Sequence, residues 1–311
     1  MNHFVKITDF SVEEIQATLK LTKELKTNRL KTPKILDQES WGLLFYKSST
    51  RTRVSFEVGV RELGANSIVL NPKNTQIGRG ETIKDTAKVL SRYLHGLVIR
   101  AYDHSVVTEF AEHATMPIVN GLTDFNHPCQ ILTDLYSLLE RYSSKEINLK
   151  SLEGKKVVFL GDTASNMANS WILAAAYLNF ELILAGPSGF EPNDTVLKTL
   201  EASNLLASHS FTNDAMAATE NADVLYTDVW VSMGDENESE ARKAIMKDYQ
   251  VNQALLKNAH KDALFLHCLP AHINEEVTRD VIEGPHSIVY DQAENRLHTQ
   301  KAIMAQLKVL R

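Results

Sequence analysis

The chain has 311 residues, of which 43% are hydrophobic and 23% are charged. This length favours two domains over one, and the composition is typical of a folded globular protein, which excludes disordered and collagen-like chains. Basic residues number 33 and acidic residues 39, a formal net charge of −6 that lacks the basic excess of a surface for nucleic acid or anionic membrane. We therefore expect no nucleic-acid or membrane partner, and an anion site only where basic residues cluster locally.

The cysteines and the most apolar stretch indicate where the protein works. Cys129 and Cys268 are far apart, and no signal-peptide pattern precedes them, so a secreted disulfide scaffold is disfavoured. Residues 171–185 are apolar but are interrupted by Asn179 and Glu181 and are too short for a membrane-spanning helix. We expect a cytoplasmic location.

The first part of the chain alternates helical and strand patterns. A helical pattern covers residues 12–21, strands are expected at 41–45 and 67–70, a helix at 82–94, a strand at 96–99 that ends at Arg100, and a short strand at 117–119 before Asn120 and Gly121. Such alternation predicts βα units and a parallel sheet.

A second α/β region follows a predicted helix at 129–142. The polar run 143–146 and then Gly154 mark the expected domain boundary. Strands are expected at 156–160, 181–185, 224–227 and 263–267, a helix at 168–178, and a helical segment at 297–310 that could pack on either domain. The predicted fold class is α/β, with two domains (1–142 and 150–290), each a mostly parallel sheet flanked by helices.

The strongest local motif covers residues 47–53, KSSTRTR, between a predicted strand and a helix. Hydroxyls, backbone amides and an arginine fork at a helix start suit a phosphate group. The alternative is that Ser49 and Thr50 only cap the helix and that the arginines are solvated. The motif lacks the glycines of nucleotide-binding loops, so the expected anion is not a nucleotide.

A second motif, His127-Pro128-Cys129-Gln130, opens the helix at 129–142. His127 could donate to a carbonyl oxygen while Gln130 accepts from an amide, which suits an amide-like substrate. The alternative is a capping histidine and a surface glutamine. Metal binding is weaker still, since no second ligand stands at the required spacing.

Three further loops follow strands of the second region. His267 and Cys268 end a strand, and because adjacent strand residues point to opposite faces they cannot form a nucleophile and base pair; a buried structural cysteine is the alternative. Asp228 with the loop to Gly234 could bind the ammonium and carboxylate of an amino acid, or could be a solvated acidic loop. The loop at 161–166 lacks the glycines of a dinucleotide site.

Taken in order, these motifs resemble the ornithine carbamoyltransferases over nearly the whole chain. The first two are shared by transcarbamoylases generally, whereas Ser232-Met233-Gly234 and His267-Cys268-Leu269-Pro270 indicate the ornithine branch. Two departures are Ile273, where many relatives carry arginine, and Ser165, where relatives often carry asparagine.

The resemblance implies an enzyme that makes citrulline and phosphate from carbamoyl phosphate and L-ornithine, without metal or cofactor. It implies a homotrimer, which could stack into larger assemblies, and a C-terminal helix (297–311) that returns to the first domain. The residues implied for carbamoyl phosphate are Ser49, Thr50, Arg51, Thr52, Arg100, His127, Gln130, Cys268, Leu269 and Arg296, with Gln76 reaching in from a neighbouring subunit. Those implied for ornithine are Leu122, Asn166, Asp228, Ser232 and Met233, and those implied in catalysis are Arg100, His127, Asp228 and Cys268.

The sequence disfavours three other functions. One is a transcarbamoylase for another amine, such as putrescine or a derivatised ornithine; Asp228 and the loop after it argue against this, because a diamine has no α-amino or α-carboxylate group to engage them. A catalytically silent binding subunit would be expected to lack some chemical positions, and here all are filled. An oxidoreductase is disfavoured by the loop at 161–166.

Overall fold

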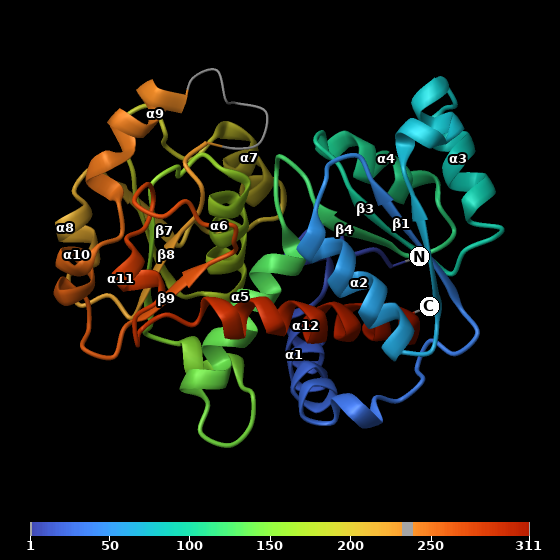
Figure 1. Cartoon of the computed structure of the whole chain (residues 1–311), viewed down its shortest axis with the longest axis horizontal. Coiled ribbons are helices and arrows are strands. Elements are labelled where there is room, and N and C mark those ends of the chain that lie inside the picture. The colour runs from blue at the N-terminus through green and yellow to red at the C-terminus, as the bar shows by residue number, and fades with distance from the viewer. Residues whose placement is uncertain (1, 232–238, 311) are drawn as a thin grey trace. The chain divides into compact units, whose positions relative to one another are not determined.

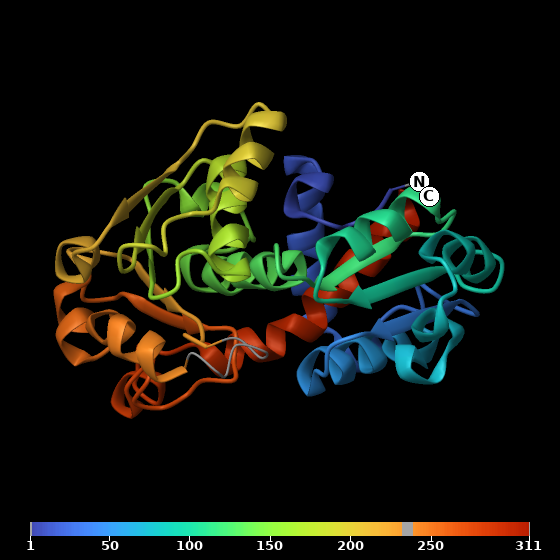
Figure 2. The same ribbon diagram turned by 90° about the horizontal axis from the view of Figure 1, so that it is seen from above.

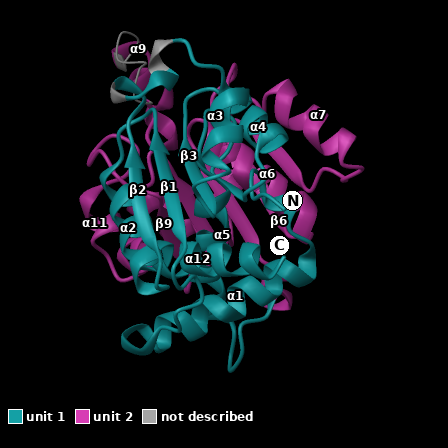
Figure 3. Ribbon diagram, turned by 90° about the vertical axis from the view of Figure 1, so that its right-hand side faces the viewer, with its two compact units in different colours: residues 1–148, 294–311 teal, residues 149–293 magenta. Residues whose placement is uncertain are grey.

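The computed structural model describes residues 2–231 and 239–310. The chain forms two compact units, coloured separately in Figure 3. Unit 1 contains residues 1–148 and 294–311, and unit 2 contains residues 149–293. Each unit is a parallel sheet flanked by helices, which confirms the predicted fold class.

The sheet of unit 1 has four parallel strands in the order β2-β1-β3-β4. The strands are β1 (Ser40–Phe45), β2 (Asn66–Leu70), β3 (Gly96–Arg100) and β4 (Ile118–Leu122). Every residue of β3 is buried, whereas four of the five residues of the edge strand β2 are exposed. The strand order reverses between β1 and β3, and open α/β sheets bind ligands at the carboxyl ends of strands that flank such a reversal.

The helices of unit 1 cover both faces of this sheet. They are α1 (Val12–Thr27), α2 (Thr50–Glu62), α3 (Ile83–Leu90), α4 (His104–His113) and α5 (Pro128–Tyr142), with short 3-10 turns at Ile7–Asp9, Arg29–Lys31, Pro72–Asn74 and Gln76–Arg79. The connection from β1 to β2 runs in one direction along the sheet, and the connections from β2 to β3 and from β3 to β4 run in the other. Because each crossover is right-handed, α2 lies on one face of the sheet and α3 and α4 lie on the other, as Figures 2 and 3 show.

The last helix, α12 (Val289–Val309), enters unit 1 at residue 294, so the predicted return of the C-terminal helix is confirmed. It packs against α2 at Gly59, where a side-chain β carbon would lie only 3.2 Å from Cγ of Lys301. The described ends of the chain lie side by side in unit 1 (Figure 2). Both ends of the chain therefore belong to unit 1.

The sheet of unit 2 has five parallel strands in the order β7-β6-β5-β8-β9. The strands are β5 (Lys156–Leu160), β6 (Glu181–Ala185), β7 (His209–Thr212), β8 (Val224–Thr227) and β9 (Leu264–His267). The helices are α6 (Asn166–Leu178), α7 (Asp194–Ala202), α8 (Ala215–Thr219), α9 (Ser239–Met246), α10 (Gln253–Asn258) and α11 (Arg279–Ile282), with 3-10 turns at Leu149–Leu152 and Lys247–Tyr249. Figure 1 shows α6 and α7 on one side of the sheet and α8 and α10 on the other. The strand order reverses between β5 and β8.

The structure corrects several predicted element bounds. Asn120, expected after a strand, lies within β4, and Arg296, expected just before a helix, lies within α12. Helix α6 begins at Asn166 because Ser165 caps it, accepting from the backbone amide of Ala168 at 3.2 Å. Strand β7 was not predicted. Among the described helices, none combines the length and the apolar character needed to cross a membrane.

Candidate functional site

In unit 1, candidate residues gather at the carboxyl ends of β1 and β3, where the strand order reverses. Ser49 caps α2, since its hydroxyl accepts from the backbone amide of Thr52 at 3.2 Å. The helix-capping role that was one alternative for Ser49 is therefore observed. Thr50 and Arg51 lie exposed in the first turn of this 13-residue helix, where backbone amides and the helix dipole favour an anion.

Two buried arginines converge on one hydroxyl in the same place. Arg296 Nη2 donates to Thr52 Oγ1 at 2.7 Å, and Arg100 Nη1 donates to the same oxygen at 3.5 Å. Arg100 is 9% exposed, Arg296 is 5% exposed and Thr52 is fully buried. Guanidinium groups remain charged in proteins, so this arrangement concentrates positive charge beside the start of α2.

His127 completes this group as a neutral side chain. Burial is the main cause that holds the pKa of His127 well below its usual value, and the charges of Arg296 and Arg100 act in the same direction. A neutral imidazole can donate one hydrogen bond without adding a third positive charge. His127 precedes α5, as the motif predicted.

The carboxamide of Gln130 is fixed by a neighbour on α5. Gln130 and Asp134 are both completely buried, and Gln130 Nε2 donates to Asp134 Oδ1 at 2.8 Å. Gln130 Oε1 has no hydrogen-bond partner among the described residues. The prediction of a surface glutamine, left open as an alternative, is therefore wrong.

The remaining candidates of unit 1 lie nearer the surface. Leu122 is half-buried at the end of β4, and its backbone amide donates to Asn120 Oδ1 at 2.9 Å. Gln76 is exposed at the start of a 3-10 turn. A cavity of about 700 Å³ beside the start of α2 is lined by Phe45, Tyr46, Ser48, Ser49, Thr50, Arg53, Val54, Val69, Leu70, Asn71, Lys73 and Tyr102.

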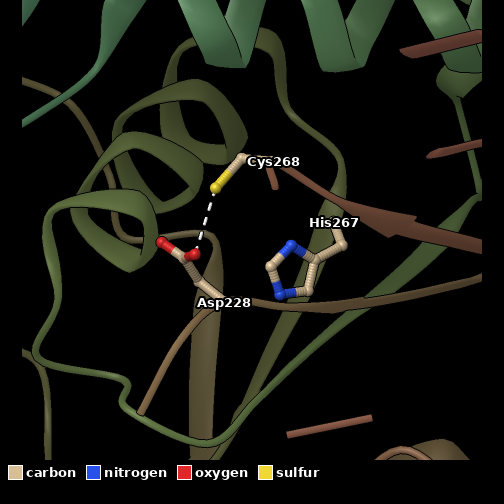
Figure 4. A group of neighbouring side chains, drawn as sticks. All are labelled: Asp228, His267 and Cys268. Atoms are coloured by element: carbon tan, nitrogen blue, oxygen red, sulfur yellow. Dashed lines mark hydrogen bonds between the residues drawn. The ribbon is translucent and has the colours of Figure 1, made fainter. Parts of the chain in front are cut away.

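In unit 2, Asp228 and Cys268 lie at the carboxyl ends of β8 and β9. Cys268 Sγ donates to Asp228 Oδ1 at 3.0 Å, the dashed bond in Figure 4. Both side chains are half-buried, and Cys268 forms no disulfide with another described residue. Asn166 is half-buried at the start of α6, which follows β5. Ser232, Met233 and Gly234 lie outside the described residues.

His267 serves the backbone of its own loop. Its Nδ1 accepts from the amide of Leu269 at 2.8 Å, and its Nε2 lies 3.2 Å from Oε1 of the fully buried Glu276. Accepting at Nδ1 places the proton on Nε2, so neither nitrogen can act as a base for Cys268. Ligand atoms of His267 and Cys268 nevertheless lie within 4.8 Å of each other, so the hydrogen bonds of His267, and not opposite strand faces, keep it from acting as that base.

Two groups of described residues bring three ligand atoms within 4.8 Å of one another. The first, Asp228, His267 and Cys268, offers two ligands, since both His267 nitrogens are engaged. In the second, His272, Glu275 and Glu276, Lys243 Nζ already lies 2.8 Å from Glu275. Neither donor set resembles a structural or catalytic zinc site.

Sequence patterns did not identify three buried carboxylates near the candidate residues. Asp134 contacts Gln130, Glu276 contacts His267, and Asp162 is ion-paired with Arg242, which also donates to the carbonyl oxygen of Trp230. Burial raises the pKa of Asp162, and the charge of Arg242 opposes that rise. For Asp134, the sequence offered one indication of this contact: it lies four residues after Gln130 on a predicted helix, and such residues lie on the same face.

Comparison with known proteins gives consistent matches along the chain. Residues 2–140 match the family model "Aspartate/ornithine carbamoyltransferase, carbamoyl-P binding domain", and residues 153–307 match "Aspartate/ornithine carbamoyltransferase, Asp/Orn binding domain". The chain is 47% identical over 306 residues to the ornithine carbamoyltransferase of Syntrophus aciditrophicus, covering 96% of this chain and 97% of that protein. It is 45% identical to a Pyrococcus furiosus protein named "Ornithine carbamoyltransferase, anabolic", covering 96% of this chain and 94% of that one.

Solved structures agree with these sequence matches. The ornithine carbamoyltransferase structure from Pyrococcus furiosus superposes with a TM-score of 0.89 at 43% identity, covering 98% of this chain and 96% of that chain. An anabolic ornithine carbamoyltransferase from Campylobacter jejuni gives a TM-score of 0.88 at 34% identity, with full coverage of both chains (100% each).

Proposed function

Since the chain belongs to the aspartate/ornithine carbamoyltransferase family, we propose which of its residues carry out the reaction of the ornithine branch. The enzyme transfers the carbamoyl group of carbamoyl phosphate to the δ-amine of L-ornithine, which gives L-citrulline and phosphate. The observation that supports the assignment most directly is the convergence of Arg100 and Arg296 on Thr52 beside neutral His127.

Carbamoyl phosphate binds to unit 1 in this proposal. The phosphate lies at the start of α2, where Ser49, Thr50, Arg51 and Thr52 supply amides, hydroxyls and a guanidinium. Arg100, Arg296 and His127 contact the carbamoyl group, and Gln130 accepts from its NH2. Cys268 and Leu269 remain predicted contacts of the same substrate from the resemblance.

The chemistry explains why this site needs positive charge without a metal. The neutral δ-amine attacks the carbonyl carbon, an oxyanion forms on the carbonyl oxygen, and the bond to the phosphate oxygen breaks. Arg100 and Arg296 stabilise the oxyanion. His127, which burial keeps neutral, donates a hydrogen bond to the same oxygen. Arg51 and the start of α2 stabilise the departing phosphate.

Ornithine binds to unit 2, with Asn166 and Asp228 contacting its α-amino and α-carboxylate groups, and Leu122 remains a predicted ornithine contact from the resemblance. Ser232 and Met233, also predicted to contact the amino-acid end, lie outside the described residues. The δ-ammonium must lose a proton before attack, since its ordinary pKa is about 10.4. The hydrogen-bonded pair of Cys268 and Asp228 is our candidate for directing that loss.

We further propose a homotrimer in which Gln76 completes a neighbour's site. The edge strand β2 exposes 45% of Ile68 and 37% of Val69, close to the exposed Val54 of α2. An apolar sheet edge of this kind favours association with a second copy. Cys129 and Cys268 form no disulfide among the described residues, which agrees with work in a reducing compartment such as the cytoplasm.

The substrate assignment is tested by measuring the carbamoylated product, which is citrulline for ornithine and a different ureido compound for each other amine. The protein is incubated with carbamoyl phosphate and one of four amines: L-ornithine, putrescine, L-aspartate or N-acetylornithine. Ornithine is expected to give the highest kcat/KM, because a site with polar partners for an α-amino acid rejects ligands that lack those groups. Putrescine ranking first would contradict the ornithine assignment.

A further inference from the structure

The pairing of Gln130 with Asp134 determines more than the position of a side chain. A carboxamide has one oxygen that accepts and one NH2 group that donates, whereas an ionised carboxylate only accepts. Gln130 Nε2 donates to Asp134 Oδ1 at 2.8 Å, and both residues are fully buried. The opposite orientation would place Gln130 Oε1 against a carboxylate oxygen, two acceptors in contact. An ionised Asp134 therefore permits only one orientation of the amide.

We propose that Asp134 is a positioning residue that makes Gln130 an obligate acceptor for the NH2 group of the carbamoyl substrate. The inference rests on the proposed function, which places Gln130 at that NH2 group. With Nε2 engaged by Asp134, the atom left for the substrate is Oε1, which has no hydrogen-bond partner among the described residues. An oxygen accepts from NH2 and disfavours a methyl group in the same place, so Asp134 indirectly sets which acyl phosphates the site accepts.

The geometry of α5 suits this role. Residues four apart lie on the same face of a helix, and Pro128 begins α5 two residues before Gln130. Gln130 therefore sits in the first turn on a fixed backbone, and its side chain is held from the next turn. Asn at position 134 would keep the size of the side chain but would offer both a donor and an acceptor, so Gln130 could turn over and present Nε2 instead.

Two phosphonates of equal size provide the test. Phosphonoacetamide carries an NH2 group beside its carbonyl, and acetonylphosphonate carries a methyl group in its place. Their dissociation constants are measured by calorimetry for the wild-type protein and for Asp134→Asn, with inorganic phosphate as a third ligand. The wild type should prefer the amide by about tenfold, the value of one buried hydrogen bond. Asp134→Asn should reduce that ratio to near one and leave the phosphate affinity unchanged.

The outcomes separate the inference from the proposed function. If the wild type shows no preference for the amide, Gln130 does not contact the carbamoyl NH2, and the proposed contact fails with the inference. If the wild type prefers the amide and Asp134→Asn keeps that preference, the contact stands and Asp134 does not orient it. A merely structural Asp134 would weaken all three ligands together.

The same ligands are also measured in a variant that lacks the Gln130 carboxamide. In Gln130→Met no carboxamide is present to orient, so the ratio should already be near one, and adding Asp134→Asn should not change it further. A further change in the double variant would show that Asp134 acts on the ligand by another route. Should thermal melts show that Asp134→Asn is unfolded, Asp134→Ser, whose smaller side chain leaves room for water, is measured with the same ligands.

Discussion

Arg51 is exposed in the first turn of α2, and Arg53 lies two residues further on. If the phosphate binds at this helix start, Arg51→Ala removes a charge-assisted contact of about 1.5 to 3 kcal/mol, which corresponds to a loss of roughly one to two decades in affinity for carbamoyl phosphate. Calorimetry with carbamoyl phosphate measures the loss directly.

Arg53→Ala is the matched control. Arg53 also lines the cavity beside the start of α2, but its Nε already pairs with Glu57 Oε1 at 2.7 Å on the same helix, so its removal should lower the affinity less than Arg51→Ala does. Equal losses in the two variants would indicate a general effect of surface charge, and no loss in Arg51→Ala would remove the phosphate site from this loop.

The two cysteines should respond to substitution in opposite ways. Cys268 donates to Asp228, whereas Cys129 is fully buried, donates to the backbone oxygen of Asn120 at 3.4 Å, and has its pKa raised by burial to about 12. Cys268→Ala and Asp228→Asn should lower kcat by about 10²-fold or more, the usual effect of removing a proton-transfer group, with little change in melting temperature. Cys129→Ala should lower the melting temperature and keep most of the activity of the folded protein. A Cys268→Ala protein that melts early but turns over normally would make that cysteine structural.

At the scale of elements, α12 carries a histidine that should make unit 1 sensitive to acid. His298 is completely buried, and neither ring nitrogen has a hydrogen-bond partner among the described residues. Burial lowers the pKa of His298 from 6.5 to about 3; the charges of Lys301, Arg29 and Lys26 act in the same direction, and Glu62 opposes them.

The sign of the pH effect follows from the lower pKa of His298 in the folded chain than in the unfolded chain. Above pH 6.5 the imidazole is neutral in the folded and the unfolded chain. Below it the unfolded chain binds a proton that the folded chain does not bind until about pH 3, so stability falls as the pH drops through that window, by up to about 1.4 kcal/mol per pH unit. Urea unfolding at pH 7, 6 and 5 should show a shallower loss for His298→Gln than for the wild type. Identical slopes in the two proteins would contradict the prediction.

The elements also show what sequence patterns can and cannot predict. Buried strands such as β3 and β5 were found because continuous apolar runs bounded by polar residues are distinctive. Strand β7 was missed because it is a four-residue edge strand, HSFT, without apolar alternation, and its pairing with β6 is decided by tertiary structure. Asn120 was placed after a strand because Asn-Gly is typical of turns, yet it lies within β4, where its Nδ2 donates to the backbone of Val5.

The same limit applies to the candidate site. Ser49, Arg100 and His127 stand at strand or helix ends that local patterns locate, so their places could be predicted. Asp134 was indicated only by its place four residues after Gln130, and no pattern indicated Glu276, because a sequence does not reveal which of its 39 acidic residues are buried against a particular partner. Buried polar contacts such as these depend on packing between elements that are distant in the chain or on faces that only the fold defines.

At the scale of the whole molecule, the proposed trimer predicts that inactive variants restore each other. If Arg51 acts in its own chain's site and Gln76 in a neighbour's, Arg51→Ala and Gln76→Ala trimers should each have little activity at low carbamoyl phosphate. In a closed three-fold ring every interface joins two different surfaces, so any mixed trimer has one interface where an intact Arg51 meets an intact Gln76.

The amount of recovered activity is fixed by the same symmetry. When the two variants are unfolded together in equal amounts and refolded, about three quarters of the trimers are mixed, and one site in three is restored in each, which gives roughly a quarter of wild-type activity. Native mass spectrometry counts the mixed trimers, and refolding each variant alone is the control. Mixed trimers without activity would mean that Gln76 does not act across an interface. Recovery near a quarter would require a site shared between two chains, because neither variant chain carries both an intact Arg51 and an intact Gln76.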